Sequence, residues 1–234
     1  MLERFRRGWA AAMTPPARLL LALRVHPDVI TWAGTLITVA LALVVFPAGW
    51  LWQGTLLITA FIFSDGIDGQ MARMLDRKSS WGAFLDSSLD RFGDGALFAG
   101  LALYYAGVGD SVLWCGMAIS ALVLGQVTSY VKARGEALGH TVRGGLAARA
   151  DRILVLFLGS LLTGLAKDGH LPQVLVWALP VALCWLVIAG VITVGQRMAQ
   201  VKRQSPPATS FSQSADPSEA PDPTTAPDLK ASGA

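Results

Sequence analysis

Charged side chains are scarce in this sequence: Asp, Glu, Lys and Arg make up 15% of its 234 residues, whereas soluble domains carry roughly 25%. This composition excludes an ordinary soluble domain. Cysteine is also scarce, and the two present, Cys115 and Cys184, lie apart inside apolar runs. The absence of a CxxC pair and of a His/Cys cluster argues against a disulfide framework and against a zinc or haem site. We interpret both cysteines as small buried hydrophobic residues.

Apolar residues are abundant instead. They make up 53% of the chain, and the mean hydropathy is +0.49. Several apolar runs approach the ~20 residues that cross a bilayer as a helix. The sequence therefore predicts an all-α integral membrane protein with six transmembrane helices in one domain, residues 27–200. The helices are expected at about 29–47, 52–73, 82–106, 111–133, 151–166 and 173–196.

The segments on either side of this domain differ from it in composition. Residues 1–26 place leucines and arginines at helical spacing, which predicts an amphipathic helix lying in the membrane interface. An ordinary basic leader fits the same residues equally well. Residues 204–234 are rich in Pro, Ser, Thr and Ala, so we expect a disordered tail without a role in the chemistry.

Basic residues mark one side of the predicted bundle. Of the 19 Lys and Arg residues, all except Lys167 and Lys230 fall near the N-terminus, in the connections 74–81 and 134–150, or at the helix ends on that side. The positive-inside rule assigns this side to the cytoplasm. We therefore expect a multi-pass protein of the inner (plasma) membrane with both termini in the cytoplasm.

Aspartates interrupt two of the apolar segments close to this side. Asp65 and Asp68 are spaced i, i+3, and Asp86 and Asp90 are spaced i, i+4, so each pair shares one helix face. A short turn joins the two helices, which predicts antiparallel neighbours and four converging carboxylates. Such a cluster needs positive charge, and hard divalent cations such as Mg²⁺ or Mn²⁺ favour oxygen ligands. Asp94, one turn deeper, is expected to pair within the protein.

Two other interpretations of these acids stay open. They could form buried ion pairs with Arg73, Arg91 or Lys132, or they could mark an ion or solute pathway across the membrane. A pathway would need polar residues that continue toward the outer face, and the last two predicted helices contain almost none. A transporter is therefore the alternative class of function to a membrane enzyme.

The aspartates belong to a longer pattern. The spacing Asp68-Gly69-x2-Ala72-Arg73-x8-Gly82-x3-Asp86-x3-Asp90 matches the signature of the CDP-alcohol phosphotransferases at every defined position. The segments HPDVIT, SYVKAR (129–134) and RADR (149–152) also resemble those of bacterial phosphatidylinositol-phosphate synthases within that family. The resemblance extends from the N-terminal region to the start of the tail.

This resemblance implies a homodimeric membrane enzyme with two metal ions, Mg²⁺ or Mn²⁺, and CDP-diacylglycerol as the donor. The metal ligands would be Asp65, Asp68, Asp86 and Asp90, and Asp90 would also be the general base. The contacts to CDP-diacylglycerol would be Asp28, Val29, Ile30, Thr31, Gly69, Ala72, Arg73, Ser79 and Gly82. Asp28 and Thr31 also have an ordinary explanation, because an acid in the first turn favours a helix N-terminus.

A second group of cations lies at helix ends where the donor needs none. It consists of Lys132, Arg134, Arg149, Arg152 and Arg197. Positive-inside topology accounts for about half of these charges, and the others suit an acceptor phosphate. The resemblance of SYVKAR and RADR selects inositol 1-phosphate, with Ser129 as a further hydrogen-bonding group and phosphatidylinositol phosphate and CMP as products. Glycerol 3-phosphate, giving phosphatidylglycerol phosphate, is the alternative acceptor, and no nucleic acid is expected to bind.

Overall fold

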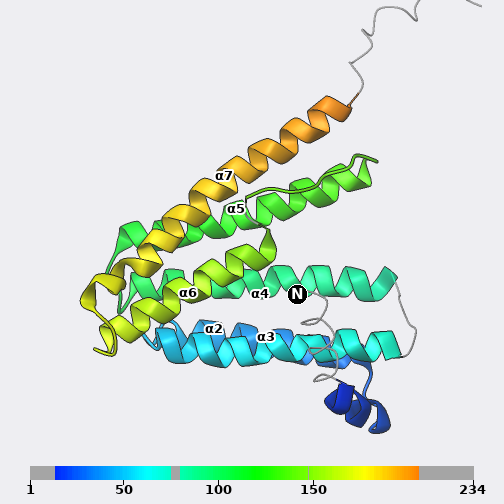
Figure 1. Ribbon diagram of the computed structural model, residues 1–234, viewed down its shortest axis with the longest axis horizontal. Coiled ribbons are helices and arrows are strands. Elements are labelled where there is room, and N and C mark those ends of the chain that lie inside the picture. The colour runs from blue at the N-terminus through cyan, green and yellow to red at the C-terminus, as the bar shows by residue number, and fades with distance from the viewer. Residues whose placement is uncertain (1–13, 75–79, 147, 206–234) are drawn as a thin grey trace, which may run out of the picture.

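The computed structural model describes residues 14–74, 80–146 and 148–205, except for the side chains of 63–70, 72 and 73. Every regular element in these ranges is a helix (Figure 1). Residues 14–22 are helical. The elements that follow are α2 (Pro27–Val45), α3 (Leu51–Met74), α4 (Ser80–Ala106), α5 (Val112–Ala137), α6 (Arg149–Lys167), the short 3-10 helix η1 (Gln173–Trp177) and α7 (Ala178–Gln204).

Each of the six predicted helices corresponds to one long helix, so the all-helical fold is confirmed. Within the described residues, three stretches are long and apolar enough to cross a membrane: Pro27–Val45, Val112–Ala137 and Gln173–Gln204. Leu51–Ile62 of α3 forms a shorter apolar helix. Two others, α4 and α6, carry several charged residues, and the site described below lies between them.

The long helices form a closed ring of contacts. Following the ring, α2 packs on α4, α4 on α5, α5 on α7, α7 on α6, α6 on α3 and α3 back on α2. Among the described residues, α3 and α4 are therefore joined mainly through α2 and not by extensive packing on each other, which differs from the neighbours expected from the short turn between them.

The core lies toward the end of the bundle where α2 turns into α3 and α6 into α7. Its largest buried side chains include Phe46, Leu101 and Leu183. Glycines permit close helix contacts here: a Cβ on Gly164 would lie 2.5 Å from the backbone nitrogen of Trp52, and one on Gly100 would meet the carbonyl of Ala42. This half of the molecule is held by apolar packing.

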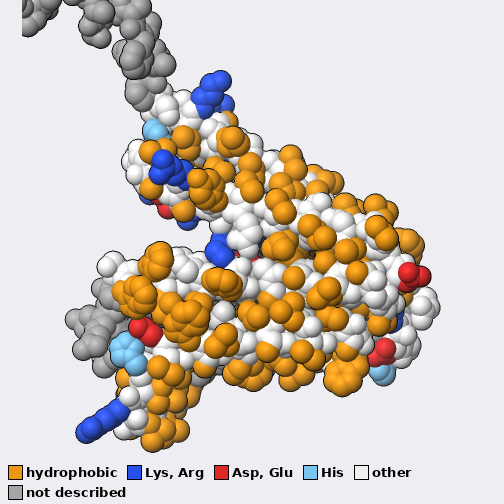
Figure 2. All heavy atoms as spheres, turned by 180° about the vertical axis from the view of Figure 1, so that it is seen from behind, with side chains coloured by type: hydrophobic (Ala, Val, Ile, Leu, Met, Phe, Trp, Pro, Cys, Tyr) orange, Lys and Arg blue, Asp and Glu red, His pale blue; other side chains and the backbone are white. Residues whose placement is uncertain are grey.

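The other end of the bundle is open. There α5 and α7 diverge from α2, α3 and α4, and the space-filling view shows a notch between the two arms with basic side chains inside it (Figures 1 and 2). The end of α3, the α5–α6 loop and the end of α7 all lie at this end (Figure 1). These are the segments in which the sequence concentrates positive charge.

The last helix is longer than its apolar run. We predicted an end near residue 196 and a domain boundary at residue 200, whereas α7 continues to Gln204. Beyond 196 the helix is largely polar, so hydropathy does not reveal this extension. Contacts described below explain why it is helical.

Candidate active site

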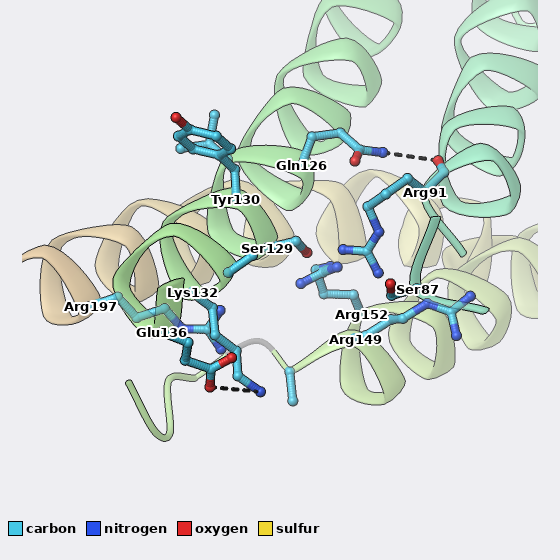
Figure 3. Close-up of a pocket in the computed structure, with 13 residues that line it drawn as sticks. Ser87, Arg91, Gln126, Ser129, Tyr130, Lys132, Glu136, Arg149, Arg152 and Arg197 are labelled. Carbon is cyan, nitrogen blue, oxygen red and sulfur yellow. Dashed lines mark hydrogen bonds and ion pairs between the residues drawn. The ribbon is translucent and has the colours of Figure 1, made fainter. Parts of the chain in front are cut away.

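A cavity of about 730 Å³ opens in the notch between α4, α5, α6 and α7 (Figure 3). Its wall combines basic groups with a few neutral polar groups and one acid. The charged lining residues are Arg91, Lys132, Glu136, Arg149, Arg152 and Arg197, and the polar ones include Ser87, Gln126, Ser129 and Tyr130. A cavity with this excess of cations is suited to a small anionic ligand.

The start of α6 supplies two of these cations. Arg149 is its first residue and Arg152 lies three positions on, so both side chains leave the same face of the first turn. Both reach across to Asp94 of α4: Arg149 Nε lies 3.0 Å from Oδ1, and an Arg152 terminal nitrogen lies 3.4 Å from Oδ2. Arg152 and Asp94 are each only 5% exposed. The prediction that Asp94 pairs inside the protein is confirmed.

Arg149 also contacts Asp90, the last aspartate of the signature motif. Its terminal nitrogen lies 2.9 Å from Oδ1 of Asp90, and its side chain is 39% exposed. Arg91, the residue after Asp90, approaches Asp90 at 3.9 Å and Asp94 at 4.0 Å. Of the partners named in the ion-pair alternative, Arg91 approaches Asp90, whereas the nearer partner, Arg149, was not among them. One arginine thus joins the signature aspartate to the basic cavity.

Sequence reasoning missed some of the lining groups. Gln126 donates through Nε2 to the backbone carbonyl of Arg91 at 3.1 Å and so ties α5 to α4 (Figure 3). It is a lone amide in an apolar helix, three residues before Ser129 and therefore on the same face. That spacing was the signal that could have identified it. Ser87 and Tyr130 carried no comparable signal.

The predicted acceptor residues divide into two groups. Ser129, Lys132, Arg149, Arg152 and Arg197 line the cavity, whereas Arg134 is exposed and lies outside that lining. The Ser129 hydroxyl donates to the carbonyl of Gly125 at 3.1 Å, and the Lys132 ammonium lies 3.8 Å from Glu136. The structure therefore brings five of the six predicted residues to one place.

Arg197 has a different environment from the other arginines. It is 8% exposed, and it donates to the backbone carbonyl of Thr128 at 2.7 Å and to that of Gly144 at 3.1 and 3.3 Å. These bonds fix α7 to α5 and to the α5–α6 loop. We therefore assign Arg197 a structural part in the cavity wall.

Two glutamines of α7, here called the glutamine clamp (Gln200 and Gln204), hold the same loop. The Gln204 side-chain amide accepts from the backbone N–H of Thr141 and donates to its carbonyl, both at 2.8 Å. The Gln200 amide pairs with the backbone of Arg143 in the same way, at 3.1 and 2.9 Å. The extra turns of α7 beyond its apolar run thus satisfy the backbone of the loop that leads to Arg149.

The signature residues lie at the same end of the bundle. On α4, Asp86 is exposed and Asp90 is partly buried one turn later. Asp65, Asp68, Gly69, Ala72 and Arg73 belong to the second half of α3, but their side chains, and all of Ser79, lie outside the described residues. Convergence of the four carboxylates therefore stays a prediction.

Among the predicted metal ligands, the two whose side chains are described, Asp86 and Asp90, fit a hard divalent cation. No group of three or more acids, histidines or cysteines forms a metal site among the described side chains, which omit Asp65 and Asp68. Asp86 and Asp90 nevertheless present carboxylate oxygens from successive turns of one helix, which are ligands that Mg²⁺ and Mn²⁺ prefer. A narrow hollow beside Asp90 is also lined by Thr38, whose buried hydroxyl has no hydrogen-bond partner within the described structure.

The predicted donor segment lies beside the start of α4. His26 caps α2 by accepting from the N–H of Asp28 at 3.3 Å, and the Thr31 hydroxyl donates to the carbonyl of Pro27. The Asp28 carboxylate accepts from the indole of Trp81 at 3.1 Å. This hydrogen bond joins the starts of α2 and α4, and Val29, Ile30 and Gly82 lie next to it in the sequence.

The sequence and fold identify the class of protein. Residues 24–192 match the family model described as CDP-alcohol phosphatidyltransferase, and the chain belongs to this family. The phosphatidylinositol phosphate synthases of Cutibacterium acnes and Streptomyces avermitilis are 58% and 43% identical to it, over 87% and 88% of this chain and 98% and 84% of their own. The resemblance inferred from the signature is thus confirmed.

Solved structures agree with this assignment. The phosphatidylinositol phosphate synthase of Mycobacterium tuberculosis with CDP-DAG bound gives a TM-score of 0.76 at 37% identity, covering 81% of this chain and 92% of that chain. The same enzyme in complex with manganese and citrate gives a TM-score of 0.74 at 37% identity, covering 81% and 88%.

Proposed function

We propose that this protein transfers the phosphatidyl group from CDP-diacylglycerol to inositol 1-phosphate, giving phosphatidylinositol phosphate and CMP. The observation that carries the proposal is the basic cavity beside Asp90, in which Arg149 contacts the signature aspartate on one side and faces the cavity on the other. A site that joins these two regions can hold the acceptor phosphate while its hydroxyl reaches the donor. The name of the relatives supports the same acceptor.

The reaction is a displacement at the β-phosphorus of the donor, the phosphorus that carries the lipid. The acceptor hydroxyl oxygen forms a new bond to this phosphorus, and the bond from phosphorus to the bridging oxygen breaks, so that CMP leaves with that oxygen. Asp90 takes the proton of the attacking hydroxyl. The surrounding residues orient the acceptor so that the hydroxyl and not bulk water lies near the phosphorus.

The charge of the cavity favours a phosphorylated acceptor. Lys132, Arg149 and Arg152 come from two helices and line one cavity. Cations outnumber acids in the cavity wall, and a phosphate accepts several charge-assisted hydrogen bonds from such a wall that a neutral alcohol such as inositol does not. Glycerol 3-phosphate carries the same charge, and it remains the second candidate acceptor.

Divalent metal ions complete the proposed site. We assign two Mg²⁺ ions, with Mn²⁺ as an alternative, to Asp65, Asp68, Asp86 and Asp90. When bound, the ions offset the charge of the donor pyrophosphate and of the departing CMP. The relative in complex with manganese supports a divalent metal in this fold. Further donor contacts are proposed for Gly69, Ala72, Arg73, Ser79 and Gly82 and for Asp28 to Thr31.

The membrane arrangement is also part of the proposal. All six long helices would span the inner membrane, with the notch and both termini on the cytoplasmic side. The helix at 14–22 exposes Arg18 and Leu19, which supports a place in the interface. Residues 27–204 would form the catalytic domain and the active enzyme would be a homodimer, with acyl chains of the donor remaining in the bilayer.

The test is CMP release from CDP-diacylglycerol by the purified protein in liposomes. Inositol 1-phosphate, free inositol and glycerol 3-phosphate are compared, each with Mg²⁺ and with a chelator. We expect metal-dependent release, fastest with inositol 1-phosphate. A preference for free inositol would contradict the phosphate cavity, and a preference for glycerol 3-phosphate would change the product. Absence of release with every acceptor would favour the transporter alternative.

A further inference from the structure

We propose that Asp94 is the positioning residue of the acceptor site. It lies outside the family signature, and it holds the guanidinium groups of Arg149 and Arg152 in the orientation that receives an acceptor phosphate. This inference rests on the proposed function for the identity of the acceptor, whereas the arrangement of the ion pairs does not depend on it.

Arg149 pairs with one carboxylate oxygen of Asp94, and Arg152 and, at a longer distance, Arg91 approach the other. Arg149 Nε lies 3.0 Å from Oδ1 of Asp94, and an Arg152 terminal nitrogen lies 3.4 Å from Oδ2. Within the described residues α4 packs on α2 and α5, whereas α6 packs on α3, α7 and η1, and the two helices do not pack extensively on each other. The Asp94 ion pairs are therefore a direct link between the helix that carries the general base and the helix that carries the phosphate-binding cations.

The charge balance explains why a carboxylate is needed at this position. Arg91, Arg149 and Arg152 all lie within 4.0 Å of Asp94. Without its charge, three guanidinium groups would repel one another, and Arg152, which is 5% exposed, would lose its buried anionic partner. The arginine side chains would then turn toward solvent or toward other acids.

Asp94 also limits the pairing of Arg149 with Asp90. Arg149 uses a terminal nitrogen on Asp90, at 2.9 Å, and Nε on Asp94. If Asp94 lost its charge, Asp90 would be the remaining acid in contact with Arg149 among the described residues. Arg149 would then be drawn toward the general base and away from the cavity. Asp94 therefore controls acceptor affinity through Arg149 and Arg152 and does not itself touch the substrate.

The experiment is a double-mutant cycle with Asp94→Asn, Arg149→Gln and the double variant in liposomes. We expect Asp94→Asn to raise the KM for inositol 1-phosphate about 10- to 100-fold, as for lost charge-assisted hydrogen bonds, and the KM for CDP-diacylglycerol by less than about twofold. The double variant should raise the acceptor KM by clearly less than the product of the two single effects, because part of the effect of Asp94 acts through Arg149 and the rest through Arg152. Equal increases in both KM values, or fully additive effects, would overturn the proposal.

Two further measurements keep the test decisive. Asp94→Glu retains the charge and should recover most of the acceptor affinity, while Asp168→Asn, at the opposite end of the bundle, is the matched control. Binding of inorganic phosphate, followed by calorimetry on each purified protein, should weaken in Asp94→Asn and not in the control. If wild-type protein turns over no phosphorylated alcohol, the proposed function fails, but the phosphate measurement still decides the role of Asp94. Phosphate binding that is unchanged in a folded Asp94→Asn protein, or equally weak in Asp94→Asn and Asp94→Glu, would refute that role.

Discussion

The two ends of the helix bundle carry their charges differently. At the closed end, the Lys167 ammonium donates to the Tyr104 hydroxyl, and the Asp168 carboxylate accepts from the indole of Trp52 at 2.7 Å. These charges have neutral partners contributed by neighbouring helices. At the open end, Arg149, Arg152, Asp90 and Asp94 pair with one another around a cavity.

The charges at the closed end therefore stabilise the fold, whereas the cations at the open end are suited to bind a ligand. Lys167 and Asp168 lie at the end of α6, where hydrogen bonds to aromatic side chains fix the helix to its neighbours. The cations of the open end outnumber the acids in the cavity wall. Since a desolvated charge without a partner is costly, an excess of this kind is typical of a binding site.

The largest expected effect comes from removing one carboxylate at the open end. Asp86→Asn should lower metal-dependent turnover by on the order of 100-fold or more, because an amide is a much weaker ligand for Mg²⁺. Asp168→Asn, the same change at the closed end, should keep turnover and cost about 1 kcal/mol of stability through weakening its bond to Trp52. CMP release, Mn²⁺ titration and thermal unfolding measure these effects. Normal metal dependence in Asp86→Asn would remove Asp86 from the metal shell.

The next effect compares two cations. Arg152→Gln should lower kcat/KM for the acceptor about 10- to 100-fold, since a charge-assisted bond to phosphate contributes about 1.5–3 kcal/mol. Lys167→Gln should leave this value unchanged, because Lys167 belongs to the other end of the bundle. The check is a titration of inositol 1-phosphate at saturating donor. Equal losses in both variants would show that the two ends do not differ in function.

A smaller effect is expected from the glutamine clamp. Gln200→Ala combined with Gln204→Ala removes four hydrogen bonds to the α5–α6 loop, and we expect the acceptor KM to rise roughly three- to tenfold, since each bond contributes about 0.5–1.5 kcal/mol and the loop can partly compensate. Gln196→Ala, an exposed glutamine of the same helix, is the control. Acceptor titration and limited proteolysis of residues 138–146 would detect the change. If the double variant leaves the proteolysis of this loop unchanged, Arg197 alone is sufficient to hold the loop in place.

The smallest effect is expected from the tail. Deletion of 208–234 should leave activity and folding unchanged, because the composition of this segment gives it little apolar surface to bury. Deletion of 200–234, which also removes the glutamine clamp, should raise the acceptor KM. Side-by-side turnover of the two truncated proteins is the measurement. Loss of activity on the shorter deletion would assign the tail a role.

Periodicity and spacing predicted much of this architecture. Six apolar runs gave six helices, and the i, i+4 spacing of Asp86, Asp90 and Asp94 placed the three carboxylates on one face of α4. Spacing also placed Arg149 and Arg152 together. These successes concern contacts within one helix, where local geometry fixes the arrangement.

Contacts between helices were harder to predict. Sequence alone could not separate Arg134, which is exposed outside the cavity wall, from Arg197, which is buried against loop carbonyls. Both satisfy the same positive-inside pattern. The position of α2 between α3 and α4 and the pairing of Gln200 and Gln204 with a distant loop depend on tertiary packing, which neither hydropathy nor helix propensity encodes.

The glutamine clamp has a consequence for the order in which the enzyme is made. Chains emerge from the ribosome N-terminus first, so α2, α3 and α4, with the whole signature, are synthesised before α7. The loop that leads to Arg149 gains its backbone partners only when Gln200 and Gln204 have followed. The donor half of the site can therefore be assembled early in synthesis, whereas the acceptor half is completed by the last turns of the final helix.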